Sequence, residues 1–141
     1  MATANKFLSF TEHLAEGVHN LQTGVIKAML TNSAPVNTNT VKADLTEISA
    51  GNGYTAGGVT LALTSSSLVS GVYRLIMVDG AITASGGSIG PFRYVAIYND
   101  TPTSPADPLI QWYDYGSSIT LLDGEPLNLD LDGTNGLLSI V

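Results

Sequence analysis

The sequence predicts an all-β protein, an antiparallel β-sandwich with the jelly roll as favoured topology and one short helix near the N-terminus. Three observations lead to this class. Short runs rich in β-branched and aromatic residues recur along the chain, and Asn-Gly, Asp-Gly and Gly-Gly pairs separate them. No alternation of strands with long helices is present, which argues against a doubly wound sheet. Short strands separated by turns at this spacing are typical of a sandwich or barrel.

The helix is expected over residues 9–17, SFTEHLAEG. Ser9 and Glu12 have the spacing of a capping box, and Phe10 and Leu14 fall on one helical face. Gly17 is placed to end the helix in a left-handed turn.

A second helical turn is expected over Lys42–Ile48, where Leu45 and Ile48 would share a face. Ser65–Ser67 and Ser117-Ser118 are expected in loops and turns. The strands are expected at Val25–Thr31, Val59–Thr64, Val72–Val78, Ala81–Ala84, Phe92–Tyr98, Leu109–Tyr115, Ser118–Leu122, Leu127–Leu131 and Leu137–Ile140.

Asp79-Gly80 gives the strongest hairpin pattern, because it lies between RLIMV and AIT and tolerates positive φ. The stretch from Gly90 to Gly116 predicts two aromatic-rich strands joined by a long loop. Pro102, Pro105 and Pro108 interrupt regular pairing in that loop, since proline donates no amide.

Alternation divides each of these two strands into faces. In the first, Arg93, Val95 and Ile97 oppose a set made up of Phe92, Tyr94, Ala96 and Tyr98. In the second, Ile110, Trp112 and Asp114 oppose a set made up of Leu109, Gln111, Tyr113 and Tyr115.

The 141 residues fit one domain, and 44% apolar residues are enough for a core that needs no disulfides or bound metal. Residues 9–141 are expected to form the sandwich, and residues 1–8 a mobile N-terminal arm. Cysteine is absent, so disulfides and thiolate chemistry are excluded.

Charge argues against several partners. The net charge is −7, and five scattered basic residues do not form the cluster that binds phosphates, so no nucleic acid is expected. No run reaches the roughly 20 apolar residues of a membrane helix, and no secretory leader is seen. We expect no membrane partner and maturation in a cytoplasm.

No catalytic or cofactor site is predicted. His13 and His19, with Glu12 or Glu16, would leave a metal shell incomplete, so surface polar residues are the favoured interpretation. Asp130–Gly136 lacks the acidic positions of a calcium loop and is expected to be a turn. No nucleophile motif surrounds any serine, so an enzyme is not expected.

Trp112, Tyr113 and Tyr115 allow two interpretations. They could form a platform on which a sugar stacks, or some could fill the core while others line a subunit contact. The second is favoured, because no run of polar residues accompanies them.

Three blocks of the sequence resemble a small structural protein of tailed bacteriophages and prophages. They are HNLQTGVIKAMLTNSAPV, GNGYTAGGV and GPFRYVAIYNDTPTSPADPLIQWYDYGSSITLLDGE, and the resemblance covers residues 5–140. It implies a capsid cement, or decoration, protein with a jelly-roll fold. Such a protein is non-enzymatic, binds the major capsid protein outside an icosahedral shell, and is assembled in the bacterial cytoplasm.

The contacts expected of such a protein fall on two segments. Phe7 or Leu8 is expected to anchor the arm on a neighbouring subunit, and the loop Asn99–Pro108 to offer Asp100 and Asp107 to basic capsid side chains. We also expect a homo-oligomer, most simply a dimer. The alternatives are a tail or fibre component and a lectin-like module that would use Trp112 and Tyr113.

Overall fold

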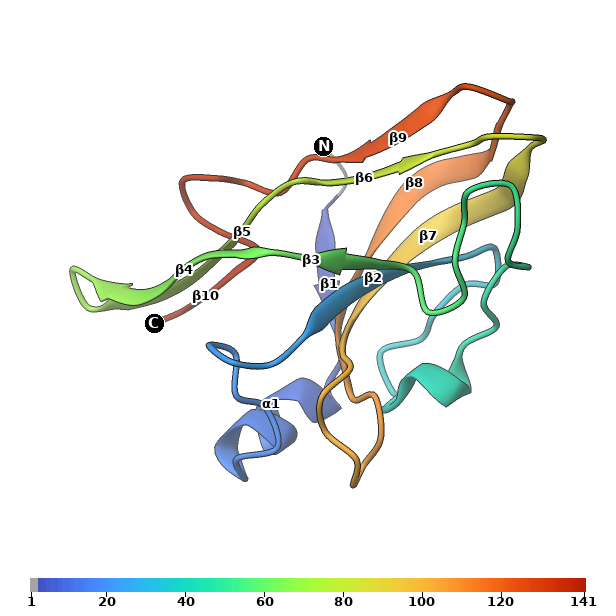
Figure 1. Ribbon diagram of the computed structural model, residues 1–141. Helices are drawn as coiled ribbons and strands as arrows, with labels where there is room; N and C mark the ends of the chain where they lie inside the picture. Colours follow the sequence, from blue (N-terminus) through green and yellow to red (C-terminus); the bar gives the residue numbers. More distant parts are fainter. Residues whose placement is uncertain (1–2) are drawn as a thin grey trace.

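The computed structural model describes residues 3–141, and most of its regular structure is β (Figure 1). The helical elements are α1 (Ser9–Ala15) and the 3₁₀ turn η1 (Lys42–Asp44). The strands are β1 (Ala4–Lys6), β2 (Ile26–Thr31), β3 (Val59–Leu61), β4 (Leu63–Val69), β5 (Val72–Met77), β6 (Gly80–Thr83), β7 (Ile89–Asn99), β8 (Leu109–Leu121), β9 (Pro126–Leu129) and β10 (Leu138–Ile140).

The strands form two layers. One is a five-stranded sheet in the order β1-β8-β7-β2-β3, and the other holds the sheet β10-β5-β4 and the pair β6-β9. Every strand pairing is antiparallel. Buried side chains of β2, β7 and β8 meet those of β5, β6 and β9 in one core. The predicted antiparallel β class with a short helix is therefore confirmed, whereas this strand order does not confirm a jelly roll.

The outer face of the five-stranded sheet carries a second, smaller cluster. It buries Phe7, Met29, Ala96, Tyr98 and Leu109, with Leu45 and Trp112 packed against it. The five-stranded sheet thus packs apolar side chains on both of its faces, which places it at the structural centre of the molecule.

The predicted faces of β7 hold only in part. Val95 and Ile97 lie in the main core and Ala96 and Tyr98 in the outer cluster, as alternation predicts. Phe92 also lies in the main core, on the face assigned to Val95, because the register shifts between Phe92 and Tyr94. A bulge of this kind inserts a residue and reverses the alternation.

A second shift, between Ile97 and Tyr98, separates residues of β8 that were predicted to share a face. Ile110 packs in the main core, whereas Leu109 and Trp112 pack in the outer cluster. Tyr113 packs against the main core instead.

The expected mobile arm at residues 1–8 is wrong for the part of it that the structure describes. Ala4, Asn5 and Lys6 pair with Tyr113, Trp112 and Gln111 of β8, so β1 is an edge strand of the main sheet. Residues 1–2 lie outside the described part of the chain.

Helix α1 begins without the predicted capping box. Leu8 already has helical dihedrals, and the amide of Phe10 donates to the carbonyl of Phe7 at 3.2 Å. The Ser9 hydroxyl has no hydrogen-bond partner, because the chain passes straight from β1 into the helix. The predicted helix end is confirmed by Gly17, whose φ is +76°.

Asp79-Gly80 does not form the predicted hairpin. β5 pairs with β4 and β10, whereas β6 pairs with β9, so Asp79-Gly80 carries the chain from one sheet to another. A Cβ on Gly80 would lie 2.9 Å from a methyl of Leu61, so any larger residue there would require the Leu61 side chain to shift.

The turn at Ser70-Gly71 makes the hairpin instead, joining β4 to β5. Both residues have positive φ, 52° and 80°, as a two-residue hairpin turn requires. Ser65–Ser67 lie in β4, not in the loop expected of them. Ser117-Ser118 likewise lie in a strand, β8, and not in a turn.

The expected turn over Lys42–Ile48 is shorter than predicted. Only Lys42–Asp44 is helical, and the Asp44 carboxylate accepts the amide of Thr40 at 2.8 Å. Leu45 packs on the outer cluster and Ile48 on the main core, so these two residues do not share a face.

Candidate interaction surfaces

The loop Asn99–Pro108 joins β7 to β8 and extends beyond them at the α1 end of the molecule (Figure 1). Its base is fixed by backbone hydrogen bonds: the amide of Asn99 donates to Pro108 and that of Asp100 to Val25, at 3.0 and 2.8 Å. The amide of Val25 donates in turn to the Thr101 hydroxyl at 2.9 Å.

The tip of the loop, Pro102–Ala106, carries no charge. Thr103 and Ala106 form a bridge across it, and Thr103, Ser104 and Ala106 are exposed. A loop held this way keeps one shape before it meets a partner, which lowers the entropy lost on binding.

The two acidic residues of the loop are less free than predicted. Asp100 pairs with Lys27 of β2 at 3.0 Å, so it is already satisfied within the chain. Asp107 has a φ of +51°, and its carbonyl accepts the amide of Lys42 at 2.9 Å. Burial and the neighbouring Asp100 carboxylate raise the pKa of Asp107. The Asp100 side chain and the Asp107 backbone carbonyl thus form part of the loop's own support.

Phe7 and Leu8 have opposite environments. Phe7 is fully buried, and its ring centre lies 4.5 Å from that of Trp112. Phe7 therefore cannot be the expected anchor on a neighbouring subunit. Leu8 is 54% exposed, and its amide donates to Asn37, next to the equally exposed Val36.

The three aromatic residues of β8 do not form one platform. Trp112 packs on Phe7 in the outer cluster, whereas Tyr113 and Tyr115 line a cleft on the inner side. Ordinary alternation along β8 explains the division, because Trp112 is followed directly by Tyr113 in a regular register. A sugar-stacking surface made of all three is excluded by this geometry.

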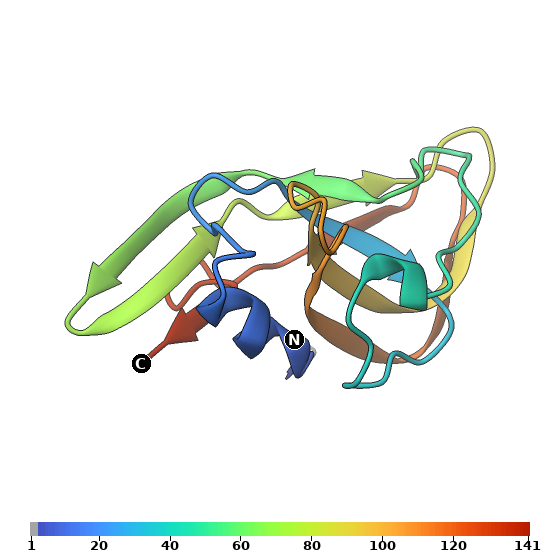
Figure 2. The same ribbon diagram turned by 90° about the horizontal axis from the view of Figure 1, so that it is seen from below.

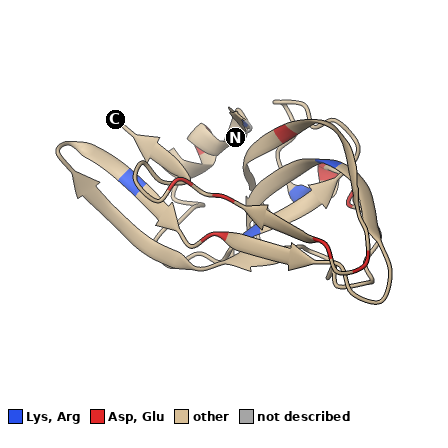
Figure 3. Cartoon of the chain, turned by 90° about the horizontal axis from the view of Figure 1, so that it is seen from above, with Lys and Arg blue, Asp and Glu red and all other residues tan. Residues whose placement is uncertain are grey.

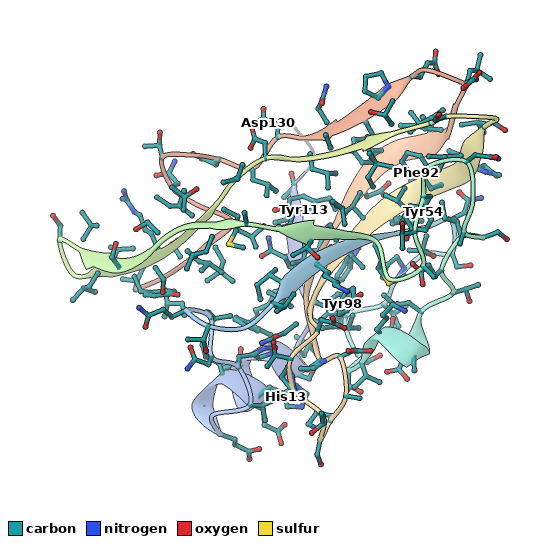
Figure 4. The ribbon with its side chains drawn as sticks, viewed as in Figure 1. His13, Tyr54, Phe92, Tyr98, Tyr113 and Asp130 are labelled. Carbon is teal, nitrogen blue, oxygen red and sulfur yellow. The ribbon has the colours of Figure 1, made fainter. Side chains whose placement is uncertain are left out.

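The cleft lies between β7, β8 and the chain around β9, and its volume is about 170 Å³. Figure 4 labels Tyr113 and Asp130 on its two sides. Its floor is apolar, from Val95, Ile97 and Leu131. The Tyr113 hydroxyl already accepts a hydrogen bond from Gln111 at 2.8 Å.

His13 and His19 are not the surface pair that was expected. His19 is buried, and its ring centre lies 5.1 Å from that of Phe10 and 6.0 Å from that of His13. Burial, with a smaller contribution from His13, lowers the pKa of His19 to about 4. His19 is thus neutral at pH 7, and Asn99 lies 3.3 Å from its Nδ1.

Asp132 organises the turn predicted at Asp130–Gly136. Its carboxylate accepts the amides of Thr134 and Asn135 at 2.8 and 2.9 Å, which lowers its pKa. Over residues 3–141 no group of three His, Cys, Asp or Glu side chains is arranged to hold a metal ion.

Sequence reasoning missed one surface, which we call the wing: β4, β5 and β10 (Figure 2). The β4–β5 hairpin projects from the body, and Leu68 and Val69 near its tip are 70% and 47% exposed. Ser-rich β4 has low β-propensity, which hid the strand. The pair Ser70-Gly71 between Leu68-Val69 and Val72-Tyr73 was the pattern that could have revealed it.

The wing is almost uncharged. Arg74 is the one charged residue between Leu61 and Val78, and Figure 3 shows the hairpin tan except for one basic band. The acidic residues are distributed over the rest of the molecule.

Comparison of the chain with protein-family models, curated proteins and solved structures found no match. Among residues 3–141, no helix is long and apolar enough to cross a membrane.

Proposed function

We propose that this chain is a non-enzymatic virion protein that binds the outside of an icosahedral phage capsid and joins neighbouring capsomers. Its partner in this role is the major capsid protein, and it is assembled in the bacterial cytoplasm. The proposal starts from the resemblance of residues 5–140 to phage structural proteins. Packaged DNA pushes outward on a shell, and a protein bound to two subunits at once opposes their separation.

The observation that carries the proposal is the loop Asn99–Pro108. Its base is fixed by bonds to Val25 and Lys42, and its exposed tip has no charge. A rigid, neutral tip can be buried against a partner without leaving a charge unpaired, which would be costly. Weak contacts of this kind suffice when many copies act on one shell and each bridges two sites.

Exposed apolar side chains flank the elements that hold this loop. Val25, at the base, is 41% exposed, and Leu8 and Val36 are each 54% exposed. Leu8 keeps the contact role predicted for it, now as a fixed side chain beside α1 rather than as part of a mobile arm.

Binding to empty shells of the phage major capsid protein proposed as the partner of this chain tests the proposal. Replacing Pro102–Ala106 by a Gly/Ser linker of equal length keeps Thr101 and the loop base. We expect it to weaken shell binding by tenfold or more, which is about 1.4 kcal/mol. Unchanged shell binding would remove the loop from the contact.

The control is Leu122→Ser, which replaces another exposed apolar residue, 61% exposed, just beyond the far end of β8. It should bind shells as the wild type does. Copy number per particle separates the capsid role from a tail or fibre role, because a cement protein follows the symmetry of the whole shell.

A further inference from the structure

The wing ends in a strand with one unpaired edge. β4 pairs with β5, and the sheet order β10-β5-β4 leaves no described strand on its other side. Figures 1 and 2 both show the hairpin extending away from the body, so the other layer does not cover this edge.

Alternation identifies which amides face outward. Val69 and Val72 flank the two-residue turn and form the hydrogen-bonded pair that closes it. Ser67 then exchanges hydrogen bonds with Arg74, whereas Leu68 and Ser66 fall at the intervening positions. The amides and carbonyls of Ser66 and Leu68 therefore point away from β5 and have no strand to bond.

This edge lacks the features that usually keep edge strands apart. Leu63–Val69 contains no charge and no proline, and its bulge lies at the start of the strand, between Leu63 and Ser65. Natural proteins protect open edges with lysine, proline or a bulge, since a bare edge pairs with other chains. An unprotected edge carrying a 70% exposed Leu68 therefore indicates a partner strand.

We propose that this partner is β4 of a second copy, paired antiparallel about a two-fold axis near Ser66. The strand reads almost the same in both directions, L-T-S-S-S-L-V. Pairing about Ser66 brings Leu63 to Val69 and Thr64 to Leu68 of the other copy. The outward-facing Ser66 then meets itself, as an isologous contact requires.

Charge favours a second copy in this place. Each chain carries a net charge of −7, so most surfaces of two copies repel each other. β4 is neutral, and its neighbour β5 adds only Arg74, so the wings can approach without contact between like charges.

The projection of the hairpin lets two bodies lie on opposite sides of the shared edge. The result is a six-stranded sheet, β10-β5-β4 followed by its two-fold copy, with one Asn99–Pro108 loop on each body. The pairing depends only on the unpaired edge of β4. Its use for bridging capsomers rests on the proposed function.

Light scattering of the purified chain tests the pairing without any capsid. The wild type should have twice the mass of one chain, and Ser66→Lys should have the mass of one, because it places two like charges opposite each other at the axis. Ser139→Lys adds the same charge to β10 at the other edge of the wing and should stay dimeric.

Cysteine crosslinking gives a second measurement that does not depend on how Ser66→Lys folds. The chain has no cysteine, so Ser66→Cys supplies the only thiol. A short thiol–thiol crosslinker should join two Ser66→Cys chains and leave Ser139→Cys chains apart.

A wild type that remains monomeric at millimolar concentration would overturn the pairing. So would a dimer in which Ser139→Cys crosslinks and Ser66→Cys does not. Shell binding is measured separately. A monomeric wild type that still binds shells would refute this inference and leave the proposed function standing. A wild-type dimer that does not bind shells would refute the proposed function and leave the pairing standing.

Discussion

At the residue scale, the Tyr54 hydroxyl joins two segments. It accepts the amide of Leu30 in β2 at 3.0 Å and donates to the Glu47 carboxylate at 2.7 Å. Glu47 also accepts the amide of Gly57 at 2.6 Å and pairs with Lys42 at 3.1 Å. Burial opposes the charge of Glu47, but its hydrogen bonds with Tyr54, Lys42 and Gly57 outweigh it and lower its pKa. This network fixes the chain after η1 on the main sheet.

Tyr54→Phe should therefore destabilise the fold by about 1–3 kcal/mol, because it leaves the buried Leu30 amide without an acceptor. Urea denaturation measures the change. Tyr94→Phe is the matched control, since Tyr94 is also buried and its hydroxyl makes no hydrogen bond to residues 3–141. Equal effects of the two substitutions would mean that the network adds nothing to stability.

His19 should make stability depend on pH. Its folded pKa is about 4, below its usual 6.5, so the unfolded chain takes up a proton first as the pH falls. The folded state should lose up to about 3 kcal/mol between pH 6.5 and pH 4 from this group. Denaturation of wild type and His19→Gln at pH 7, 6 and 5 measures it. Parallel curves would show that His19 titrates alike in both states.

At the element scale, β1 is an edge strand that is held on the main sheet by one buried side chain next to it, that of Phe7. Lys6, Asn5 and Ala4 pair with β8, and Phe7 then turns into the outer cluster beside Trp112. The exposed and partly exposed residues before Phe7 gave no sign of a strand, because their partner lies more than a hundred residues away.

Phe7→Ala should destabilise the protein by about 3–5 kcal/mol, the usual loss for a buried aromatic side chain. Leu8→Ala should change stability by no more than about 0.5 kcal/mol, because Leu8 is exposed. Thermal denaturation of both variants measures the contrast. A small effect of Phe7→Ala would support the sequence-based prediction that residues 1–8 form a mobile arm.

At the scale of the whole molecule, the two apolar clusters share one sheet. β7 and β8 contribute to the main core with Val95 and Ile110, and to the outer cluster with Ala96 and Leu109. The first and last strands of the described residues, β1 and β10, also belong to sheets. The clusters should therefore unfold together.

Trp112 reports on the outer cluster, and far-ultraviolet circular dichroism reports on all strands. Their denaturation midpoints should coincide, as expected of a two-state domain. Leu137→Ala, in the main core, should shift both midpoints equally. A tryptophan transition that precedes the loss of strands would show that the outer cluster is an independent unit.

The sequence by itself determined the class of this protein, the position of its helix and most of its strands. These follow from local patterns: residue type, alternation, and turn pairs such as Asn52-Gly53, where positive φ closes a bridge from Gly51 to Tyr54. The absence of cysteine also excluded disulfides.

Only the tertiary structure decided which strands pair and which faces they bury. The bulges placed Phe92 on the inner face with Val95, and Ile110 on the inner face with Tyr113. A one-residue shift of this kind reverses every face beyond it. Asp79-Gly80 and Ser70-Gly71 look alike as turns, yet only the second makes a hairpin. Pairing partners are chosen by contacts between distant segments, so local patterns could reveal neither the fixed N-terminal strand nor the open edge of β4.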